Sequence, residues 1–296
     1  MTRKILLIGG SGSIGPALLV SLSTLGEVTV TQRIDPTQTR TYYDARADHE
    51  TTQLDNLQFA SFDIVVYSAA LSSMSACETR PSESSRLNFE TPTQLARAAE
   101  ATGLYFVFLS SSAAAEYDGM SEPEALLANK NGLRGASTYG LHKFLAECEL
   151  RKRGSALVIR PAKVAPFSWP LIPMWISELS NGYTISAFND DYVSPIHTEA
   201  LSRVVFSATA QRLTGLVEIS ASDRVSYFEV AKYLAARLGR SLDLVRGVSA
   251  MTLKDPRHVL SKTRLNNGRA QDLLGYAPPT SLEVVERSFF GGASLS

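Results

Sequence analysis

The N-terminus of the chain passes from a short apolar run into a glycine-rich turn and then into a helix-like segment. Ile5–Ile8 is a run of four apolar residues, which is typical of a strand buried on both faces. Glycines follow at positions 9, 12 and 15, and Pro16–Leu25 has apolar residues at helical spacing. A strand, a tight turn and a helix in this order favour a fold built on a parallel sheet.

The same alternation continues through the first half of the chain. Apolar, β-rich runs predict further strands, and segments with helical spacing predict helices between them. The predicted strands are Val28–Thr31, Ile64–Tyr67, Tyr105–Leu109 and Ala156–Ile159, and the predicted helices are Pro92–Thr102 and Tyr139–Arg153. We therefore expect an α/β fold with a Rossmann-type doubly wound parallel sheet.

The second half of the chain is less regular. Residues 166–173 contain three prolines and two aromatic residues, which predicts a loop. We place the domain boundary near residue 165. Residues 1–165 are expected to form the first domain, rejoined by about 188–210, and residues 166–296 mainly a smaller C-terminal α/β domain.

Composition argues against several classes of function. The 296 residues carry 29 Lys and Arg and 29 Asp and Glu, whereas a general nucleic-acid binder needs a basic excess. Two distant cysteines, Cys77 and Cys148, predict neither a disulfide framework nor a zinc site, and no other metal-ligand pattern occurs. The N-terminal apolar run is too short for a signal peptide, and no run is long enough to span a membrane. We expect a cytoplasmic protein without membrane or nucleic-acid partners.

The glycine spacing has a chemical use. The pyrophosphate of a dinucleotide must approach the backbone at such a turn, where side chains would block it and a helix N-terminus supplies N–H donors. The alternative is a tight turn without a ligand. We expect cofactor contacts from Gly9, Gly12, Ser13, Ile14 and Gly15.

The end of the second predicted strand bears on the choice of cofactor. NAD sites commonly place a carboxylate there to hold the ribose 2′-hydroxyl. This strand is followed by Gln32 and Arg33, and a guanidinium suits a 2′-phosphate. NADP is favoured and NAD remains possible; the alternative for Arg33 is a solvated loop cation.

Tyr139 and Lys143 stand at positions i and i+4 of a predicted helix, so their side chains share one face. A tyrosine of ordinary pKa is a poor acid–base group at neutral pH, and a nearby ammonium lowers that pKa. A serine at the end of the preceding strand can hydrogen-bond a substrate oxygen. Together these groups suit hydride transfer at a carbonyl carbon.

With these residues the chain resembles an extended short-chain dehydrogenase/reductase. Within that superfamily it is most similar to the dTDP-4-dehydrorhamnose reductase-like branch, which is related to the nucleotide-sugar epimerases and dehydratases. The resemblance covers nearly the whole chain. It is carried by Gly9–Gly15, Ser68–Ala70, Glu78, Pro81, Arg86–Asn88, Phe106–Ser111, Tyr139–Glu147, Leu157–Pro161, Asn189–Pro195, Ser261–Leu265 and Leu274–Tyr276.

The resemblance implies roles for single residues. Tyr139 would be the acid–base group, Lys143 would lower its pKa and bind the ribose, and Asn88 would hold a helix and a water near the active site. The cofactor would be contacted further by Asp44 at the adenine, by Ala69 and Ala70 along the groove, and by the stretch from Pro161 to Val164 near the nicotinamide.

Two candidates exist for the catalytic serine. Counting from the strand Tyr105–Leu109 gives Ser111, and counting back from Tyr117 gives Ser112. We prefer Ser111, because strand register is firmer than loop length. The alternative role for serines in this run is hydrogen bonding at the turn.

The resemblance places Lys163, Asp191 and Tyr192 at the substrate. Lys163 stands where relatives carry Trp or Asn, and a lysine there suggests an anionic group on the substrate. The alternative is a lysine that reaches solvent or pairs with Asp190 or Asp191.

Four other residues are expected to have structural roles. His142 is expected at the surface of its helix, and His197 is expected to be structural. Trp169 and Trp175 either close over a ligand or pack the second domain, and packing is favoured.

Three functions compete. The leading one is an NADPH-dependent reductase of a keto group on a nucleotide sugar or a similar polar, possibly anionic metabolite. The second is a sugar epimerase or dehydratase, against which Arg33 and the Ser112–Ala113 pair argue. The third is a non-catalytic dinucleotide-binding regulatory subunit, which the presence of both Tyr139 and Lys143 disfavours. A homodimer is a further expectation from the resemblance.

Overall fold

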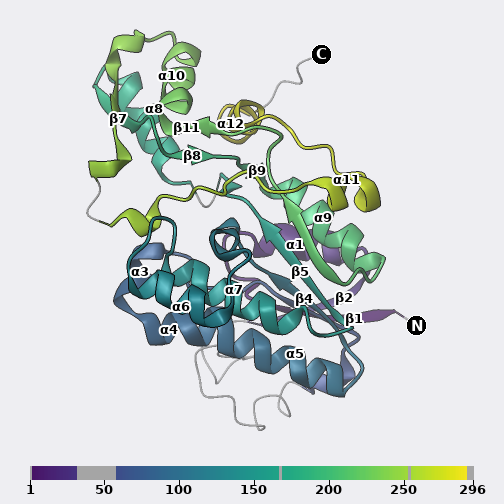
Figure 1. Ribbon diagram of the computed structural model, residues 1–296. Helices are drawn as coiled ribbons and strands as arrows, with labels where there is room; N and C mark the ends of the chain where they lie inside the picture. Colours follow the sequence, from purple (N-terminus) through teal and green to yellow (C-terminus); the bar gives the residue numbers. More distant parts are fainter. Residues whose placement is uncertain (1, 32–57, 167–168, 253–254, 292–296) are drawn as a thin grey trace, which may run out of the picture.

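The structure is a computed structural model that describes residues 2–31, 58–166, 169–252 and 255–291 (Figure 1). Its strands are β1 (Arg3–Ile8), β2 (Gly26–Val30), β3 (Ile64–Tyr67), β4 (Tyr105–Leu109), β5 (Ala156–Pro161), β6 (Val164–Ala165), β7 (Ile185–Phe188), β8 (Tyr192–Val193), β9 (Ile196–His197), β10 (Gly215–Ile219), β11 (Val225–Ser226) and β12 (Val245–Val248). Its α-helices are α1 (Gly15–Leu22), α3 (Met74–Thr79), α4 (Pro81–Ser85), α5 (Thr91–Ala101), α6 (Glu122–Lys130), α7 (Thr138–Leu150), α8 (Leu171–Ser180), α9 (Thr198–Ala210), α10 (Tyr227–Arg237), α11 (Gly268–Leu274) and α12 (Ser281–Phe289). Short 3₁₀ and π turns lie between them, among them η2 (Arg86–Glu90), η3 (Ser112–Tyr117) and η6 (Pro256–His258).

Six strands form one parallel sheet in the order β10-β5-β4-β3-β1-β2. Strand β1 pairs with β2 on one side and with β3 on the other, so Ile5 lies opposite both Val28 and Ile64. The strands added after β1 therefore lie on opposite sides of it, with β2 on one side and β3 on the other. In sheets of this kind, ligands bind beyond the carboxyl ends of the strands, at the place where the strand order reverses. The expected Rossmann-type doubly wound sheet is confirmed.

Both faces of the sheet are covered by helices, which explains why its strands are apolar throughout (Figure 1). Alternate residues of β1 point to opposite sides: Ile5 and Leu7 pack with α1 and α9, while Leu6 and Ile8 pack with α5 and α7. The period of two side chains along a strand produces this division. Because both faces are buried, the sheet holds its carboxyl-terminal edge rigidly in place.

A second, smaller unit follows the sheet. Helices α8, α10 and α12 surround the short strand pairs β7–β12 and β8–β11, and their apolar faces form a separate core. Trp169 and Trp175 are buried in this core at 1% and 4% exposure, so the packing role is confirmed. The expected loop at 166–173 is wrong in its last residues, because Leu171 begins α8 and Pro173 is tolerated in a first helical turn.

The chain returns from this unit to the sheet. Helix α9 packs beside α1, and β10 pairs with β5 as an outer strand of the sheet. Gln32, Arg33 and Asp44 lie outside the described residues. Among the residues that the structure does describe, no helix is long and apolar enough to cross a membrane.

Candidate active site

A cavity of about 740 Å³ lies at the carboxyl ends of the central strands, between the sheet and the second unit. It is lined by most of the residues that the sequence predicts as site residues. These are Gly9, Gly12, Ser13, Ile14, Ala69, Ala70, Ser111, Ser112, Tyr139, Lys143, Pro161, Lys163, Val164, Asp191 and Tyr192. Gly15 and Asn88 are not part of the lining.

The glycines at one end of the cavity differ in how much space a side chain would find at each position. Gly9 has a φ of +89°, and a Cβ there would lie 2.4 Å from the backbone nitrogen of Ala69. A Cβ on Gly15 would lie 2.0 Å from the carbonyl oxygen of Gly10, so this glycine permits the turn to close against α1. A Cβ on Gly12 would lie 3.2 Å from the carbonyl oxygen of Gly9 and would meet no other atom within 4 Å among the described residues. Gly12 itself lines the cavity.

Tyr139 lies in the first turn of α7. The side chain of Ser137 caps this helix by accepting a hydrogen bond from the Gly140 backbone N–H at 3.1 Å. The Tyr139 side chain is 8% exposed and lines the cavity. Burial raises the pKa of Tyr139 to about 12, and a hydrogen bond with Ser111 acts in the opposite direction. The phenol therefore carries its proton at neutral pH.

Lys143 lies one turn further along α7 and is 1% exposed. Its ammonium donates a hydrogen bond to the carbonyl oxygen of Leu109 at 2.8 Å and lies 4.4 Å from the ring centre of Phe108. Burial lowers the pKa of Lys143 to about 7.

The three serines after β4 have different surroundings. Ser110 hydrogen-bonds the buried carboxylate of Glu147. Ser111 caps the η3 turn by accepting a hydrogen bond from the Ala113 backbone N–H, and its hydroxyl acts to lower the pKa of Tyr139. Ser112 is buried at 6% exposure and also lines the cavity. Both candidate serines therefore reach the cavity, and Ser111 is the one that influences the phenol.

Asn88 lies in the π-helical turn η2 and is fully buried. Its side-chain amide donates to the carbonyl oxygen of Leu71 at 3.0 Å and to the hydroxyl of Ser84 at 3.2 Å. This residue therefore ties η2 to the segment that follows β3, one layer behind the cavity wall. Single π turns inside helices occur often at functional sites.

Lys163, which follows β5, and Asp191, which precedes β8, both line the cavity. Each is a charged neighbour of the other, and among the described residues no ion pair within 4.0 Å joins Lys163 to Asp190 or Asp191. Burial lowers the pKa of Lys163, and Asp191 opposes this shift. Burial raises the pKa of Asp191 to about 6.

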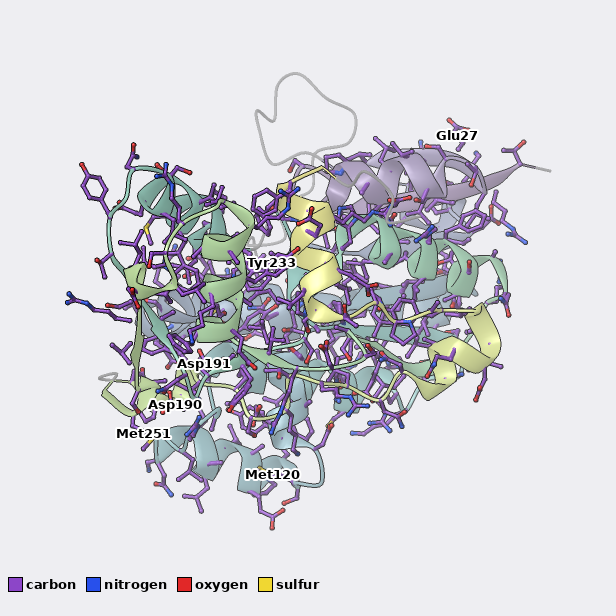
Figure 2. The ribbon with its side chains drawn as sticks, turned by 90° about the horizontal axis from the view of Figure 1, so that it is seen from above. Glu27, Met120, Asp190, Asp191, Tyr233 and Met251 are labelled. Atoms are coloured by element: carbon purple, nitrogen blue, oxygen red, sulfur yellow. The ribbon has the colours of Figure 1, made fainter. Side chains whose placement is uncertain are left out.

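The neighbouring carboxylate has a different role. Asp190 accepts hydrogen bonds from the Ser249 hydroxyl and the Ala250 backbone N–H, both at 2.6 Å. Figure 2 shows Asp190 and Asp191 close to Met251, on the side of the second unit. Asp190 therefore fixes the loop after β12, and Asp191 is the carboxylate that lines the cavity.

The two histidines singled out in the sequence have structural contacts. The side chain of His197 accepts a hydrogen bond from the Glu199 backbone N–H at 3.2 Å and caps α9, which confirms a structural role. The expectation of a surface position for His142 is wrong. Its Nδ1 hydrogen-bonds the hydroxyl of Ser84 on α4 at 2.8 Å, and burial lowers its pKa to about 4.

Several lining residues have no local signal in the sequence. They come from the segment after β3, from the second unit and from the stretch before α11. They are Ser72, Ser73, Met74, Pro170, Tyr227, His258, Leu260 and Thr263. Only their arrangement in space identifies them.

Comparison with known proteins assigns the chain to a family. Residues 3–289 match the family described as RmlD substrate binding domain. The chain belongs to this family. The match covers the sheet, the cavity and the second unit, and agrees with the resemblance to the dTDP-4-dehydrorhamnose reductase-like branch of the extended short-chain dehydrogenase/reductases.

Solved structures of this family and its neighbours share the fold. A dTDP-4-dehydrorhamnose reductase of Clostridium acetobutylicum superimposes with a TM-score of 0.77 at 17% identity, over 97% of this chain and 99% of that one. The Bacillus anthracis dTDP-4-dehydrorhamnose reductase in complex with NADP gives 0.77 at 16% identity, over 99% and 100%. The UDP-glucose 4-epimerase of Thermotoga maritima with UDP-glucose gives 0.74 at 18% identity, over 97% of each chain.

Proposed function

We propose that this protein is an NADPH-dependent reductase of a keto group on a nucleotide sugar. The observation that carries the proposal is that Ser111, Tyr139 and Lys143 line the same cavity as the glycine turn. An acid–base group and a dinucleotide cradle in one cavity suit hydride transfer at a carbonyl. The family membership supports this choice, since its members with solved structures include dTDP-4-dehydrorhamnose reductases.

The residues around the turn fit NADPH. A Cβ at Gly12 would project into the space that a pyrophosphate needs, and the N-terminal residue Ile14 of the α1 turn lines the same space. Ser13, Ala69 and Ala70 would complete this part of the site, with Pro161 and Val164 further along. Outside the described residues, Gln32, Arg33 and Asp44 are proposed for the adenosine end, where Arg33 would meet the 2′-phosphate. When bound, NADPH supplies the hydride for the carbonyl carbon.

The chain's own residues would handle the proton. Tyr139 holds a proton on its phenol at neutral pH, because burial raises its pKa to about 12. It would give this proton to the substrate oxygen as negative charge develops there. Ser111, which lines the cavity with Tyr139 and acts to lower the pKa of the phenol, would orient that oxygen. Lys143 would hold the ribose and add positive charge behind the phenol.

The substrate would be held mainly by residues 166–296, and the cofactor by residues 1–165 with the segment near 188–210. Lys163 faces the cavity with Asp191 as its charged neighbour, and burial still lowers the pKa of Lys163. An anionic group on the substrate would compensate the buried cation further. We therefore favour a substrate with an acidic group on its sugar, contacted by Lys163, with Asp191 and Tyr192 beside it. A cytoplasmic location and a homodimer remain predictions from the sequence.

A substrate panel tests the proposal. The purified protein is incubated with NADPH and with 4-keto sugars on dTDP and UDP carriers, with and without a sugar carboxylate. We expect NADPH oxidation with at least one of them, with a KM that rises in Lys163→Met only for the acidic substrates. No oxidation with any 4-keto sugar, or cofactor that stays bound and unchanged while the sugar is epimerised, would overturn the reductase proposal.

A further inference from the structure

One wall of the cavity comes from a short segment near the C-terminal end of the chain. Residues 255–263 contribute His258, Leu260 and Thr263 to the lining. Leu260 also packs against the buried cluster that contains Tyr139. The segment therefore contacts the surroundings of the acid–base residue, although it follows the second unit in the chain.

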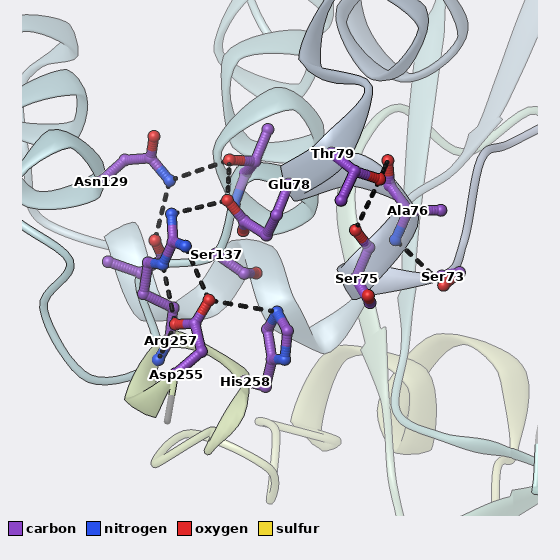
Figure 3. Close-up of polar contacts among 12 residues, drawn as sticks. Ser73, Ser75, Ala76, Glu78, Thr79, Asn129, Ser137, Asp255, Arg257 and His258 are labelled. Atoms are coloured by element: carbon purple, nitrogen blue, oxygen red, sulfur yellow. Dashed lines mark hydrogen bonds and ion pairs between the residues drawn. The ribbon is translucent and has the colours of Figure 1, made fainter. Parts of the chain in front are cut away.

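Glu78, on α3, joins this segment to helix α7. Its carboxylate accepts two hydrogen bonds from Thr138, one from the backbone N–H and one from the hydroxyl, both at 2.7 Å. The same carboxylate pairs with Nη1 of Arg257 at 2.6 Å (Figure 3). Thr138 is the first residue of α7 and directly precedes Tyr139. With side-chain exposures of 12% and 26%, the ion pair is partly shielded from water.

Asp255 fixes the direction in which Arg257 points. Its carboxylate accepts hydrogen bonds from Nε of Arg257 at 2.8 Å and from Nη2 at 2.6 Å. Because a guanidinium is planar and its donors have a fixed geometry, these contacts direct Nη1 at Glu78. His258 stands next in the chain, with its Nε2 3.9 Å from Asp255. The same cluster therefore lies beside an imidazole that lines the cavity wall (Figure 3).

A second carboxylate holds the far end of the segment. Glu116, in η3, accepts hydrogen bonds from the backbone N–H groups of Ser261 and Lys262 and from the Ser261 hydroxyl, each at 2.6 Å. The η3 turn begins directly after Ser111. Both anchoring carboxylates therefore belong to, or bind, the elements that carry the proposed catalytic residues.

We propose that residues 255–263 are the specificity-determining wall of the active site, and that Glu78 is a positioning residue that seats this wall on the helix of Tyr139. The inference rests on the proposed reductase function. A wall anchored in this way sets where the sugar lies relative to the Tyr139 phenol. A misplacement of about 1 Å costs up to about 100-fold in rate, so loss of the anchor acts on the substrate and not on the cofactor.

Variants at the two ends of the ion pair test this. Glu78→Gln keeps an oxygen for Thr138 but loses the charge, and Arg257→Met removes the cation. With dTDP-4-dehydrorhamnose as the probe, each is expected to lower kcat/KM by about tenfold or more, mainly through KM, while the Kd of NADPH changes less than about twofold. The double variant should be no worse than either single one, because both remove the same contact. Arg257→Lys should restore only a small part of the loss, because a single ammonium cannot be held by Asp255 through two donors and also pair with Glu78.

The matched control is Arg97→Met, which removes a surface ion pair with Glu149 at 3.4 Å on α5 and α7. It should behave as the wild type. An unchanged KM in Glu78→Gln and Arg257→Met would overturn the proposal, because the contact would then not affect substrate binding. An equal weakening of NADPH binding would also overturn it, because the contact would then stabilise the whole fold and not the substrate site alone.

Amide hydrogen exchange supplies a readout that does not need turnover. Arg257→Met should speed exchange both in residues 255–263 and in the first turn of α7, since Glu78 joins the two. Faster exchange confined to 255–263, or no change in either, would overturn the role of Glu78. If the wild type reduces no nucleotide sugar, the proposed function fails. The hydrogen-exchange result still tests whether Glu78 connects residues 255–263 to helix α7.

Discussion

Ser111 and Tyr139 line the same cavity as the glycine turn, and the Ser111 hydroxyl acts to lower the pKa of the Tyr139 phenol against the effect of burial. Ser112 follows directly and also lines the cavity. Ser111→Ala is therefore expected to lower kcat by about 100-fold or more, and Ser112→Ala by much less. Single-turnover kinetics with saturating NADPH measures both. A larger loss in Ser112→Ala would assign the catalytic role to Ser112.

Tyr139→Phe removes the proposed proton donor and keeps the ring. We expect a loss of about 100- to 10,000-fold in kcat. NADPH binding, followed by cofactor fluorescence, should stay within about twofold of the wild type, because the phenol oxygen does not belong to the glycine turn. Substantial remaining turnover would mean that another group supplies the proton.

The glycines of the turn separate cofactor binding from folding. In Gly12→Ala the new methyl group meets only the carbonyl oxygen of Gly9, at 3.2 Å, and otherwise faces the cavity. The variant should fold and bind NADPH at least about tenfold more weakly. In Gly15→Ala the methyl group would lie 2.0 Å from the carbonyl oxygen of Gly10, so the thermal midpoint itself should fall. Undiminished NADPH binding by Gly12→Ala would contradict the proposal that the glycine turn binds the pyrophosphate.

Arg33→Asp tests the choice of cofactor. If Arg33 meets the 2′-phosphate, the variant should lose about tenfold or more in affinity for NADPH and little for NADH. Arg40→Asp, which changes the charge by the same amount nearby in the sequence, is the control. Equal effects of both substitutions would mean that overall charge, and not a specific contact, decides.

Lys143 gives the stability of the fold a pH dependence. Burial lowers its pKa from 10.5 to about 7, so between these values the unfolded chain binds more protons than the folded one. The free energy of unfolding therefore rises with pH in this range, by up to about 1.4 kcal/mol per pH unit. Denaturant unfolding at pH 7 and pH 9 should show the wild type gaining stability relative to Lys143→Met. An equal rise in the free energy of unfolding of both proteins would contradict the lowered pKa of Lys143.

Much of the fold is predictable because its signals are local. Ile64–Tyr67 is an apolar run of strand length, and the helix with Tyr139 and Lys143 carries its own spacing of four. The position of His142 is not local. Which helix face is covered depends on Ser84, on another helix 58 positions away. The prolines of 166–173 are ambiguous as well, since proline also starts helices.

The wall of the cavity shows more clearly that contacts between distant parts of the chain cannot be predicted from local sequence signals. Glu78 and Arg257 are 179 positions apart, and each alone is an ordinary surface-type charge in the sequence. Their contact exists only because the chain returns from the second unit across the end of the sheet. Likewise, Lys163 can be singled out from the sequence, but its place in the cavity wall beside Asp191 is visible only in the structure.

The most direct measurement of the central claim follows the hydride itself. NADPH carrying two deuterium atoms at the nicotinamide C4 is incubated with the wild-type protein and with dTDP-linked 4-keto sugars, with and without a sugar carboxylate, and the product is analysed by mass spectrometry and NMR. The account predicts one deuterium on the former keto carbon for each NADPH oxidised, and none with Tyr139→Phe over the same time. A product that is altered in stereochemistry but carries no deuterium, with the added NADPH intact, would contradict it.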